Sequence, residues 1–404
     1  MRTVYLDNNA TTKVADEVID AMMPYLKEEW GNPSSMHDFG GHVKQAVEEA
    51  RAAVAGLLGA KDLSEIIFTS CGSESDNTAI LSALQAQPDK KHVITTRVEH
   101  PAVLAVCQYL ERKGYRITYL GVDNQGLLDL DELERNITSD TALITTMWAN
   151  NETGVIFPVE EIGAIARRHG VLFHTDAVQV AGKLKIDMKN TPVDMLSISG
   201  HKFHAPKGVG ALYVRHGVSF RPFLRGGHQE RGRRGGTEAV PNVVALGKAA
   251  ELAGAHIEDE QSRVGRLRDR LEQGIVESIP HLRINGHRKI RLPSTTNISF
   301  EFVEGEAILL LLSDHGIAAS SGSACSSGSL EPSHVLRAMG VPYTYAHGSI
   351  RFSLSRYNTD EDIDYTLEQL PPIIARLREI SPFYKKEHPM PQDTRGMTNR
   401  QTAR

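Results

Sequence analysis

The sequence of 404 residues has little cysteine, little excess charge and no long hydrophobic run. Its three cysteines, Cys71, Cys107 and Cys325, are too few and too scattered for a disulfide framework or a zinc site, and they favour a reducing compartment. No apolar run approaches the roughly 20 residues of a membrane-spanning helix, and the first residues lack the apolar core of a signal peptide. The formal net charge of −5 disfavours a dedicated nucleic-acid or anionic-membrane binder. We therefore expect a cytoplasmic, globular enzyme.

Residues 15–255 alternate short apolar runs with segments of helical periodicity, the pattern of βαβ units. The apolar runs do not alternate with polar residues, which predicts a mostly parallel sheet buried on both faces between helices. The pattern changes near residue 255, and a long charged helix is expected over 258–278. We predict a large α/β domain over 15–255 and a smaller α+β domain formed by residues 1–14 and 256–380. Residues 381–404 are rich in Lys, Arg, Pro, Thr and Gln, which predicts a flexible tail.

Two short segments carry weak signals of chemistry. The turn Ser70-Cys71-Gly72-Ser73 follows a predicted strand and opens a helix, so its backbone N–H groups and hydroxyl are suited to a phosphate. Taken alone, an ordinary helix cap is the simpler interpretation of these residues. His100 stands between a strand and Pro101, where a single histidine is more often structural than catalytic.

An acid and a lysine follow two successive predicted strands. Asp176 ends one of them, and Lys202 follows the next strand 26 residues later. Open α/β sheets bind ligands at this edge. Singly, Asp176 is equally well explained as a helix cap or as a ligand of a metal, a ribose or a ring nitrogen, and Lys202 as a solvated surface group. Together they have the spacing of a pyridoxal phosphate site, in which the lysine forms a Schiff base and the acid keeps the pyridine nitrogen protonated.

The chain resembles the NifS/IscS-type cysteine desulfurases of the class-V aminotransferase family from about residue 4 to 380. The segments that carry the resemblance are DNNATT at 7–12, GNPSS at 31–35, WANNETG at 148–154, VLFHTDAVQ at 171–179, SISGHKFHAPKG at 197–208, GGHQERG at 226–232 and SSGSAC at 320–325. The resemblance implies a fold-type-I pyridoxal phosphate enzyme with a seven-stranded, mostly parallel sheet. It also implies a homodimer that converts L-cysteine to L-alanine.

Carried over position by position, the resemblance implies a role for each of several residues. Lys202 binds the cofactor and moves the proton at the substrate's Cα, Asp176 pairs with the ring nitrogen, and Gln179 contacts the phenolic oxygen. His100 stacks on the ring and assists proton transfers. Further cofactor contacts fall on Cys71, Gly72, Ser73, Asn151, Ser199, His201 and, from the second subunit, Thr237. Asn151 and Arg351 match the positions that recognise the substrate carboxylate, which suits the two-pronged geometry of arginine.

Cys325 separates desulfurases from other enzymes that use this cofactor. The Ser- and Gly-rich segment around it, residues 320–330, cannot bury enough apolar surface to hold itself still, which predicts a mobile loop. A mobile thiolate suits sulfur transfer, because it can attack the substrate's sulfur and then carry the persulfide to an acceptor. A buried structural cysteine, the usual interpretation of a lone thiol, fits Cys107 better. Cys325 is also a candidate transient ligand of an iron–sulfur cluster shared with a scaffold partner.

The resemblance implies an iron–sulfur scaffold or acceptor protein as partner. The amino-acid sequences of residues 69–88, 231–237 and 307–332 are most similar to those of the nitrogen-fixation branch of the family. This similarity implies that the sulfur is destined for nitrogenase clusters.

Other readings of the sequence stay open at this point. Lys202 and Asp176 serve selenocysteine lysis, β-elimination and transamination as well as sulfur transfer. A binding function is the alternative of a different class, either as an iron–sulfur scaffold or through RNA phosphates. The arginines available for RNA lie in one glycine-rich stretch at positions 221, 225, 231, 233 and 234. Because the chain is acidic and the stretch has few aromatic residues for base stacking, we do not expect nucleic acid to be the main partner.

Overall fold

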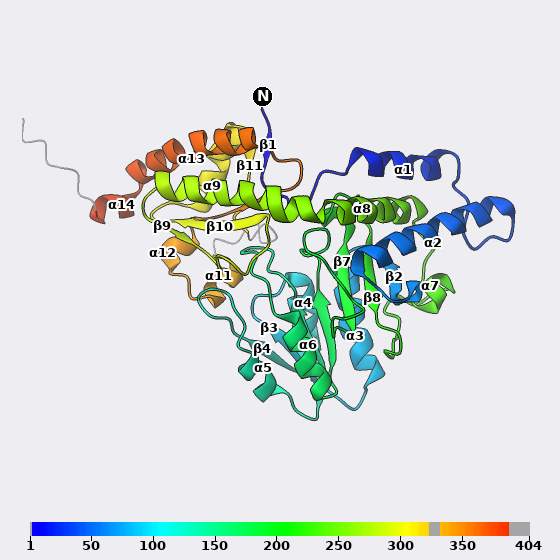
Figure 1. Ribbon diagram of the computed structural model, residues 1–404. Helices are drawn as coiled ribbons and strands as arrows, with labels where there is room; N and C mark the ends of the chain where they lie inside the picture. Colours follow the sequence, from blue (N-terminus) through cyan, green and yellow to red (C-terminus); the bar gives the residue numbers. More distant parts are fainter. Residues whose placement is uncertain (1, 323–331, 388–404) are drawn as a thin grey trace, which may run out of the picture.

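The computed structural model describes residues 2–322 and 332–387. Within this part of the chain, seven strands form one sheet in the order β2-β8-β7-β6-β5-β3-β4 (Figure 1). In that order the strands span Ile66–Thr69, Gly210–Val214, Met195–Ser199, Leu172–Asp176, Thr141–Met147, His92–Thr96 and Arg116–Leu120. β8 is antiparallel to both of its neighbours, and the other pairs are parallel. The predicted mostly parallel, seven-stranded sheet is therefore confirmed.

Helices cover both faces of this sheet, as the uninterrupted apolar runs predict. In β2, Ile66 and Phe68 join the core on the side of α2, α6 and α8, whereas Ile67 joins the core on the side of α3 and α4. Alternate residues of a strand point to opposite faces, so both sets must be apolar when both faces are covered. These five helices span Asp38–Leu58, Val159–Arg168, Val240–Asp259, Gly72–Ala86 and Pro101–Arg112.

A long helical run connects the large sheet to the second part of the molecule (Figure 1). α8 continues through a π-helical turn, η3 (Glu260–Val264), into α9 (Gly265–Ser278). The predicted charged helix at 258–278 thus starts earlier, at Val240, and the predicted domain boundary at 255 falls inside the run. The start of the helical run at Val240 is difficult to predict from the sequence, because α8 is rich in Ala and Gly and packs closely on α2. A Cβ on Gly247 would lie 2.5 Å from the Cα of Ala50.

A smaller antiparallel sheet lies under α9, with strand order β12-β10-β9. Its apolar core joins Val4 and Leu6 of the N-terminus to residues of α9, β10, β12, α10 and α13. β1 pairs in parallel with β11. These elements span Ser349–Ser353 (β12), Thr295–Phe300 (β10), Leu282–Ile284 (β9), Val4–Tyr5 (β1), Ile317–Ala318 (β11), Gly305–Asp314 (α10) and Asp360–Ile380 (α13). The exact division of the chain into two domains stays a prediction.

The remaining helices are shorter or peripheral. They span Asp16–Lys27 (α1), Leu63–Glu65 (η1), Leu130–Asn136 (α5), Gln229–Gly232 (α7), His334–Ala338 (α11), Tyr343–Ala346 (α12) and Pro382–Glu387 (α14). α14 stands where we expected the tail to begin, and the ring of Tyr384 contacts that of Phe302 edge-on with centroids 5.6 Å apart. The rest of the predicted tail lies outside the described residues.

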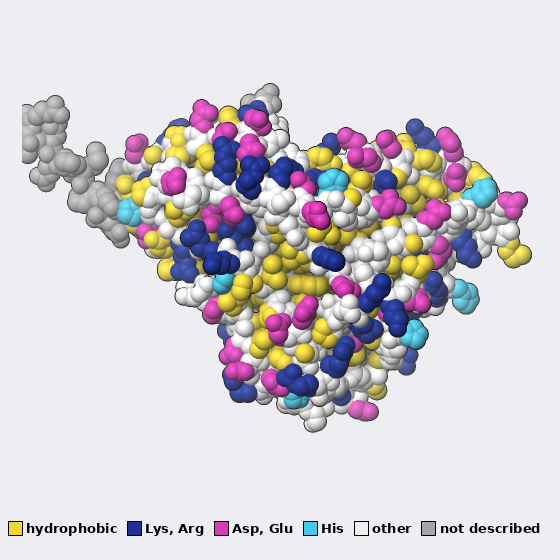
Figure 2. Space-filling model, viewed as in Figure 1, with side chains coloured by type: hydrophobic (Ala, Val, Ile, Leu, Met, Phe, Trp, Pro, Cys, Tyr) yellow, Lys and Arg dark blue, Asp and Glu magenta, His cyan; other side chains and the backbone are white. Residues whose placement is uncertain are grey.

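The surface carries charges of both signs. On the face that Figure 2 shows, basic side chains form several separate groups with acidic side chains between them. Among the helices described for residues 2–322 and 332–387, none combines the length and the apolar character needed to cross a membrane.

Candidate active site

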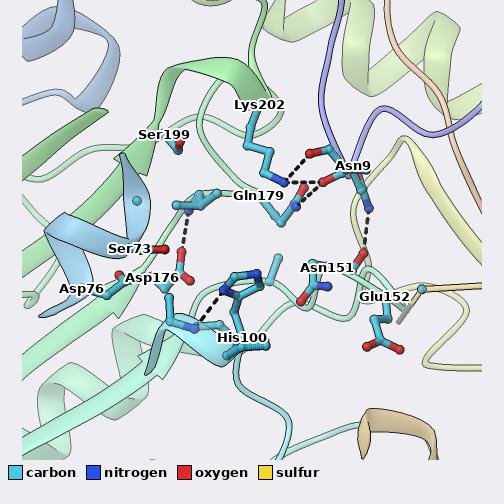
Figure 3. Close-up of a pocket in the computed structure, with 18 of the residues that line it drawn as sticks. Asn9, Ser73, Asp76, His100, Asn151, Glu152, Asp176, Gln179, Ser199 and Lys202 are labelled. Atoms are coloured by element: carbon cyan, nitrogen blue, oxygen red, sulfur yellow. Dashed lines mark hydrogen bonds between the residues drawn. The ribbon is translucent and has the colours of Figure 1, made fainter. Parts of the chain in front are cut away.

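A cavity of about 540 Å³ opens at the carboxyl ends of the parallel strands, a volume typical of small-molecule sites (Figure 3). Its walls come from the loops after β2, β3, β5, β6 and β7 and from β12 of the smaller sheet. The predicted site residues that line it are Cys71, Gly72, Ser73, His100, Asn151, Asp176, Gln179, Ser199, His201, Lys202 and Arg351. The fold thus brings together residues that are up to 280 positions apart in the sequence.

Lys202 enters the cavity from a tight turn directly after β7. This 3-10 turn, η2 (Gly200–Lys202), begins at a glycine for which a Cβ would lie 2.9 Å from the side chains of Ala205 and Leu246. Only a residue without a side chain allows this close approach. The Lys202 amine donates hydrogen bonds to the backbone carbonyls of Asn9, at 2.6 Å, and Ala10, at 2.9 Å. The N-terminal segment therefore orients the amine.

Asp176, the last residue of β6, is a buried carboxyl group beside the cavity. Burial raises its pKa to about 6, although the N–H of Val178, 2.9 Å away, and the Lys202 cation both lower it. Burial also raises the pKa of the carboxyls of Asp76 and Glu99, that of Glu99 to about 8. Glu99 is therefore protonated at neutral pH, whereas Asp176 is a carboxylate that can carry charge toward a ligand. A cationic ring nitrogen is a suitable partner for it.

The N-terminus of α3 forms another wall of the cavity. Its N-cap residue, Cys71, makes no side-chain hydrogen bond to the helix among the described residues. A Cβ on Gly72 would lie 2.9 Å from a methyl group of Val178, so a glycine is needed for this helix end to lie so close to the loop after β6. Ser73, Ser199 and His201 line the same cavity. Backbone N–H groups and hydroxyls at a helix N-terminus are the donors that bind a phosphate.

His100 caps α4 and faces the cavity as a neutral ring. Its Nδ1 accepts a hydrogen bond from the N–H of Ala102 at 3.1 Å. Burial, together with the nearby Lys202 and His334, lowers the pKa of His100 to about 4. A neutral imidazole whose Nδ1 accepts must carry its proton on Nε2. The ring therefore presents a hydrogen-bond donor and a flat face, and not a ready base.

Arg351 reaches the cavity from β12 and is buried. Its guanidinium donates to the Asp7 carboxylate at 2.6 Å and to the carbonyl of Asn151 at 3.0 Å. Its Nε–H is buried and has no hydrogen-bond partner among the described residues. A buried donor without a partner costs free energy. The guanidinium group of Arg351 borders the cavity, and such a group is suited to binding a carboxylate.

One predicted site residue lies away from this cavity, and another lies outside the described residues. Thr237 is exposed and does not line it. Cys325 lies outside the described residues, as does most of the predicted mobile loop. The residues on either side of that segment, Gly322 and Pro332, both line the cavity. Cys107, predicted to be structural, is fully buried on α4, and burial raises the pKa of its thiol to about 12.

The structure also identifies cavity residues for which the sequence analysis predicted no role. Asn9 is the most connected of them: its side-chain amide donates to the carbonyl of Asn151 at 3.1 Å and to the hydroxyl of Thr295 at 2.9 Å. Asn9 belongs to the segment DNNATT, which is one of the segments that carry the family resemblance. This resemblance was the signal in the sequence that could have identified Asn9 as a site residue. The others are Ala10, Asp76, Pro101, Ala102, Met147, Ala149, Glu152, Val178, Gly322, Pro332, Ser333, His334 and Arg337.

These residues fit pyridoxal phosphate. The buried carboxylate of Asp176 suits the pyridine nitrogen, the N-terminus of α3 with Ser73 and Ser199 suits the phosphate, and the amine of Lys202 suits the aldehyde. The cavity combines apolar wall surface with many polar and charged side chains, which suits a cofactor that has both a ring and a charged phosphate.

Comparison with known proteins agrees with this geometry. Residues 4–366 match the family model described as aminotransferase class-V. The chain is 63% identical to cysteine desulfurase 2 of Trichormus variabilis over 95% of its length and 96% of that protein. It is 58% identical to the cysteine desulfurase NifS of Azotobacter vinelandii over 96% and 97%. A solved NifS-like protein superposes with a TM-score of 0.88 at 40% identity and covers 93% of this chain and 100% of its own. The predicted family, fold and cofactor are confirmed, and the chain belongs to the class-V aminotransferases as a pyridoxal phosphate-dependent cysteine desulfurase.

Proposed function

We propose that this desulfurase holds its cofactor between Asp176 and Lys202 and takes up sulfur on Cys325. The observation that carries the proposal is that Asp176, Lys202 and the N-terminus of α3 border one cavity. When bound, pyridoxal phosphate withdraws electrons from the amino acid attached to it, which makes the Cα proton removable. Lys202 accepts that proton at Nζ, and the Asp176 carboxylate balances the charge of the ring nitrogen.

In this proposal, other cavity residues bind different parts of the cofactor and the substrate. Ser73, Ser199 and His201 hold the phosphate, and His201 is neutral because burial lowers its pKa to about 4. Arg351 binds the substrate carboxylate, with Asn151 beside it. Gln179 meets the phenolic oxygen, and the ring of His100 covers the cofactor.

Sulfur transfer requires a nucleophile, for which we propose the thiolate of Cys325. It forms a bond to the substrate's sulfur as the Cβ–S bond breaks. The electron pair of the broken bond stays with the carbon, which takes up a proton and becomes the methyl group of alanine. Cys325 is left as a persulfide, and this oxidised sulfur is the group that an acceptor receives.

We further propose that the enzyme works as a homodimer in which Thr237 completes the partner's phosphate site. Thr237 is exposed, as a residue that acts across an interface must be before assembly. The segment between α1 and α2 exposes large apolar side chains, with Trp30 at 72% and Met36 at 101% exposure. Monomeric proteins rarely leave such side chains together at the surface, so a second copy of this chain is the occupant we expect.

An iron–sulfur acceptor protein is the proposed destination of the persulfide, with nitrogenase clusters as the end product. The similarity to the nitrogen-fixation branch and the 58% identity to the NifS protein of Azotobacter vinelandii support this proposal. The cytoplasmic location and the role of Cys325 as a transient cluster ligand stay predictions.

The structure gives little support to an RNA site on the arginine-rich stretch. Arg234 donates to the Glu74 carboxylate at 2.8 Å, Arg231 pairs with Glu48 at 3.7 Å and Arg225 donates to Gln85 at 3.0 Å. Arginines that pair with their own chain contribute less to phosphate binding than unpaired ones.

The proposed function predicts a balanced reaction. Purified protein with pyridoxal phosphate should show the visible absorbance of the bound cofactor. On addition of L-cysteine and a thiol reductant it should release alanine and sulfide in equal amounts, because each turnover splits one Cβ–S bond. Amino-acid analysis and a sulfide assay measure the two products. A colourless protein that gains no absorbance from added cofactor would contradict the proposal.

Arg351→Met should raise KM for L-cysteine by about 10 to 100-fold, the effect of losing a hydrogen bond to a charged group. Cofactor absorbance should stay unchanged, because Arg351 is assigned to the substrate and not to the cofactor. Arg337, the other arginine among the described cavity residues, provides the comparison. If Arg337→Met raises KM more than Arg351→Met does, the carboxylate site belongs to Arg337.

A further inference from the structure

A second lysine, Lys183, is buried behind the cavity wall and has no part in the mechanism above. It follows β6 and is only 6% exposed. Its amine donates to the side-chain oxygen of Gln179 at 3.0 Å and to that of Asn9 at 3.1 Å. A lysine is rarely buried without a specific partner, and these contacts connect it to the side chain assigned to the phenolic oxygen of the cofactor.

The contacts of Gln179 determine which end of its amide faces which neighbour. The two ends of a glutamine amide have the same shape, so hydrogen-bond partners decide its orientation. The carbonyl of Asn9, 3.0 Å away, can only accept, and the charged amine of Lys183 can only donate. Nε2 must therefore face Asn9 and Oε1 must face Lys183. One N–H of Nε2 is used by Asn9, and the second remains for a ligand in the cavity that Gln179 lines.

The orientation holds whether or not Lys183 is charged. The pKa of its amine is lowered to about 7, chiefly by burial; Glu260 of η3 opposes this shift, and Lys202 and Arg351 contribute to it. A neutral amine still has two N–H groups for its two oxygen partners. Turning the Gln179 amide around would bring its oxygen against the carbonyl oxygen of Asn9. The Asn9 amide cannot turn either, because its nitrogen donates to the carbonyl of Asn151.

We propose that Lys183 is a positioning residue that holds Gln179 with an N–H directed at the phenolic oxygen of the cofactor. The inference rests on the proposed function, since it concerns the same site. By donating to Oε1, the Lys183 amine also polarises the amide and makes Nε2–H a stronger donor, because linked hydrogen bonds strengthen one another. A stronger donor stabilises negative charge on the phenolic oxygen and so lowers the pH at which the bound cofactor titrates.

The experiment is a double-mutant cycle read from the cofactor's colour. The variants are Lys183→Met, Gln179→Leu and the double variant, each loaded with pyridoxal phosphate. The readout is the midpoint pH of the visible absorbance change without substrate. Gln179→Leu should raise the midpoint by about one pH unit, and Lys183→Met by about 0.5 to 1 unit. In the Gln179→Leu background, Lys183→Met should add nothing, because it acts through the amide. Lys185→Met changes an exposed lysine of the same segment and should leave the midpoint unchanged.

The cycle separates positioning from a simple charge effect. If Lys183 acts only as a nearby cation, its removal raises the midpoint equally in both backgrounds, and additive shifts overturn the inference. Should Lys183→Met not fold, Lys183→Arg keeps a donor at this position and should retain the wild-type midpoint, and a raised midpoint overturns the inference. If the unaltered chain gains no cofactor absorbance, the proposed function fails, and the inference fails with it. Additive shifts in coloured protein overturn the inference alone.

Discussion

Lys202→Ala should lower the rate of alanine formation from L-cysteine by at least about 10³-fold, within the range for loss of a positioned acid–base group. The geometry gives the reason. The amine is held by two backbone carbonyls of the N-terminal segment and borders the same cavity as the buried carboxylate of Asp176. Single-turnover assays of alanine measure the loss. Borohydride reduction of the unaltered enzyme, followed by mass spectrometry, should find the cofactor attached to the peptide that contains Lys202.

Two other lysines make this prediction specific. Lys207 is exposed five residues further along, and Lys207→Ala should leave turnover within about twofold, as for a surface substitution. Lys183 is the serious competitor, because it is buried near the cavity and burial lowers its pKa to about 7. Cofactor attached to the Lys183 peptide, or turnover in Lys202→Ala within tenfold of the unaltered enzyme, would contradict the assignment of Lys202.

The edge of the sheet that carries Asp176 and Lys202 could be predicted from the sequence for a physical reason. Parallel strands that are buried on both faces consist of unbroken runs of apolar residues, and their carboxyl ends lie at the same edge of the sheet. Residues that follow such runs are therefore expected at the same edge of the sheet, even before the pairing of strands is known. β6 and β7 do pair, with Asp176 opposite Ser197. The antiparallel direction of β8 had no such signal, because its sequence is as apolar as the sequences of the strands that run parallel to one another.

The contacts of Asn9 could not be derived from local sequence. Asn9 binds Lys202 across 193 positions and Asn151 across 142, and no periodicity relates segments so far apart. The same holds for Arg337 and Glu152, which reach the cavity from different parts of the fold. The family resemblance identified the segment that contains Asn9, but the contacts of Asn9 are explained only by the folded cavity. Likewise, the start of α8 was hidden because its Ala- and Gly-rich surface packs on another helix and shows no polar stripe.

Cys325→Ala should abolish alanine and sulfide formation from L-cysteine, a loss of at least about 10³-fold, while the bound cofactor keeps its colour. The reason is that removal of the nucleophile leaves the Cβ–S bond without a sulfur acceptor. Selenocysteine should still give alanine, because the weaker carbon–selenium bond breaks without a thiolate. Retained turnover of selenocysteine therefore shows that the cofactor and Lys202 still work in this variant. Amino-acid analysis with each substrate measures both rates.

The decisive comparison is with Cys71, because that thiol lines the cavity itself and is partly exposed. Cys107 is no competitor, since burial raises its pKa to about 12 and keeps it protonated. If Cys71 were the nucleophile, Cys71→Ala would stop cysteine turnover and Cys325→Ala would not. We expect the opposite, because Cys71 is fixed as the N-cap of α3, where a persulfide could not leave the site for an acceptor. A thiol that must first meet the substrate and then a partner protein has to belong to a segment that can do both. The described residues on either side of the Cys325 segment, Gly322 and Pro332, border the cavity.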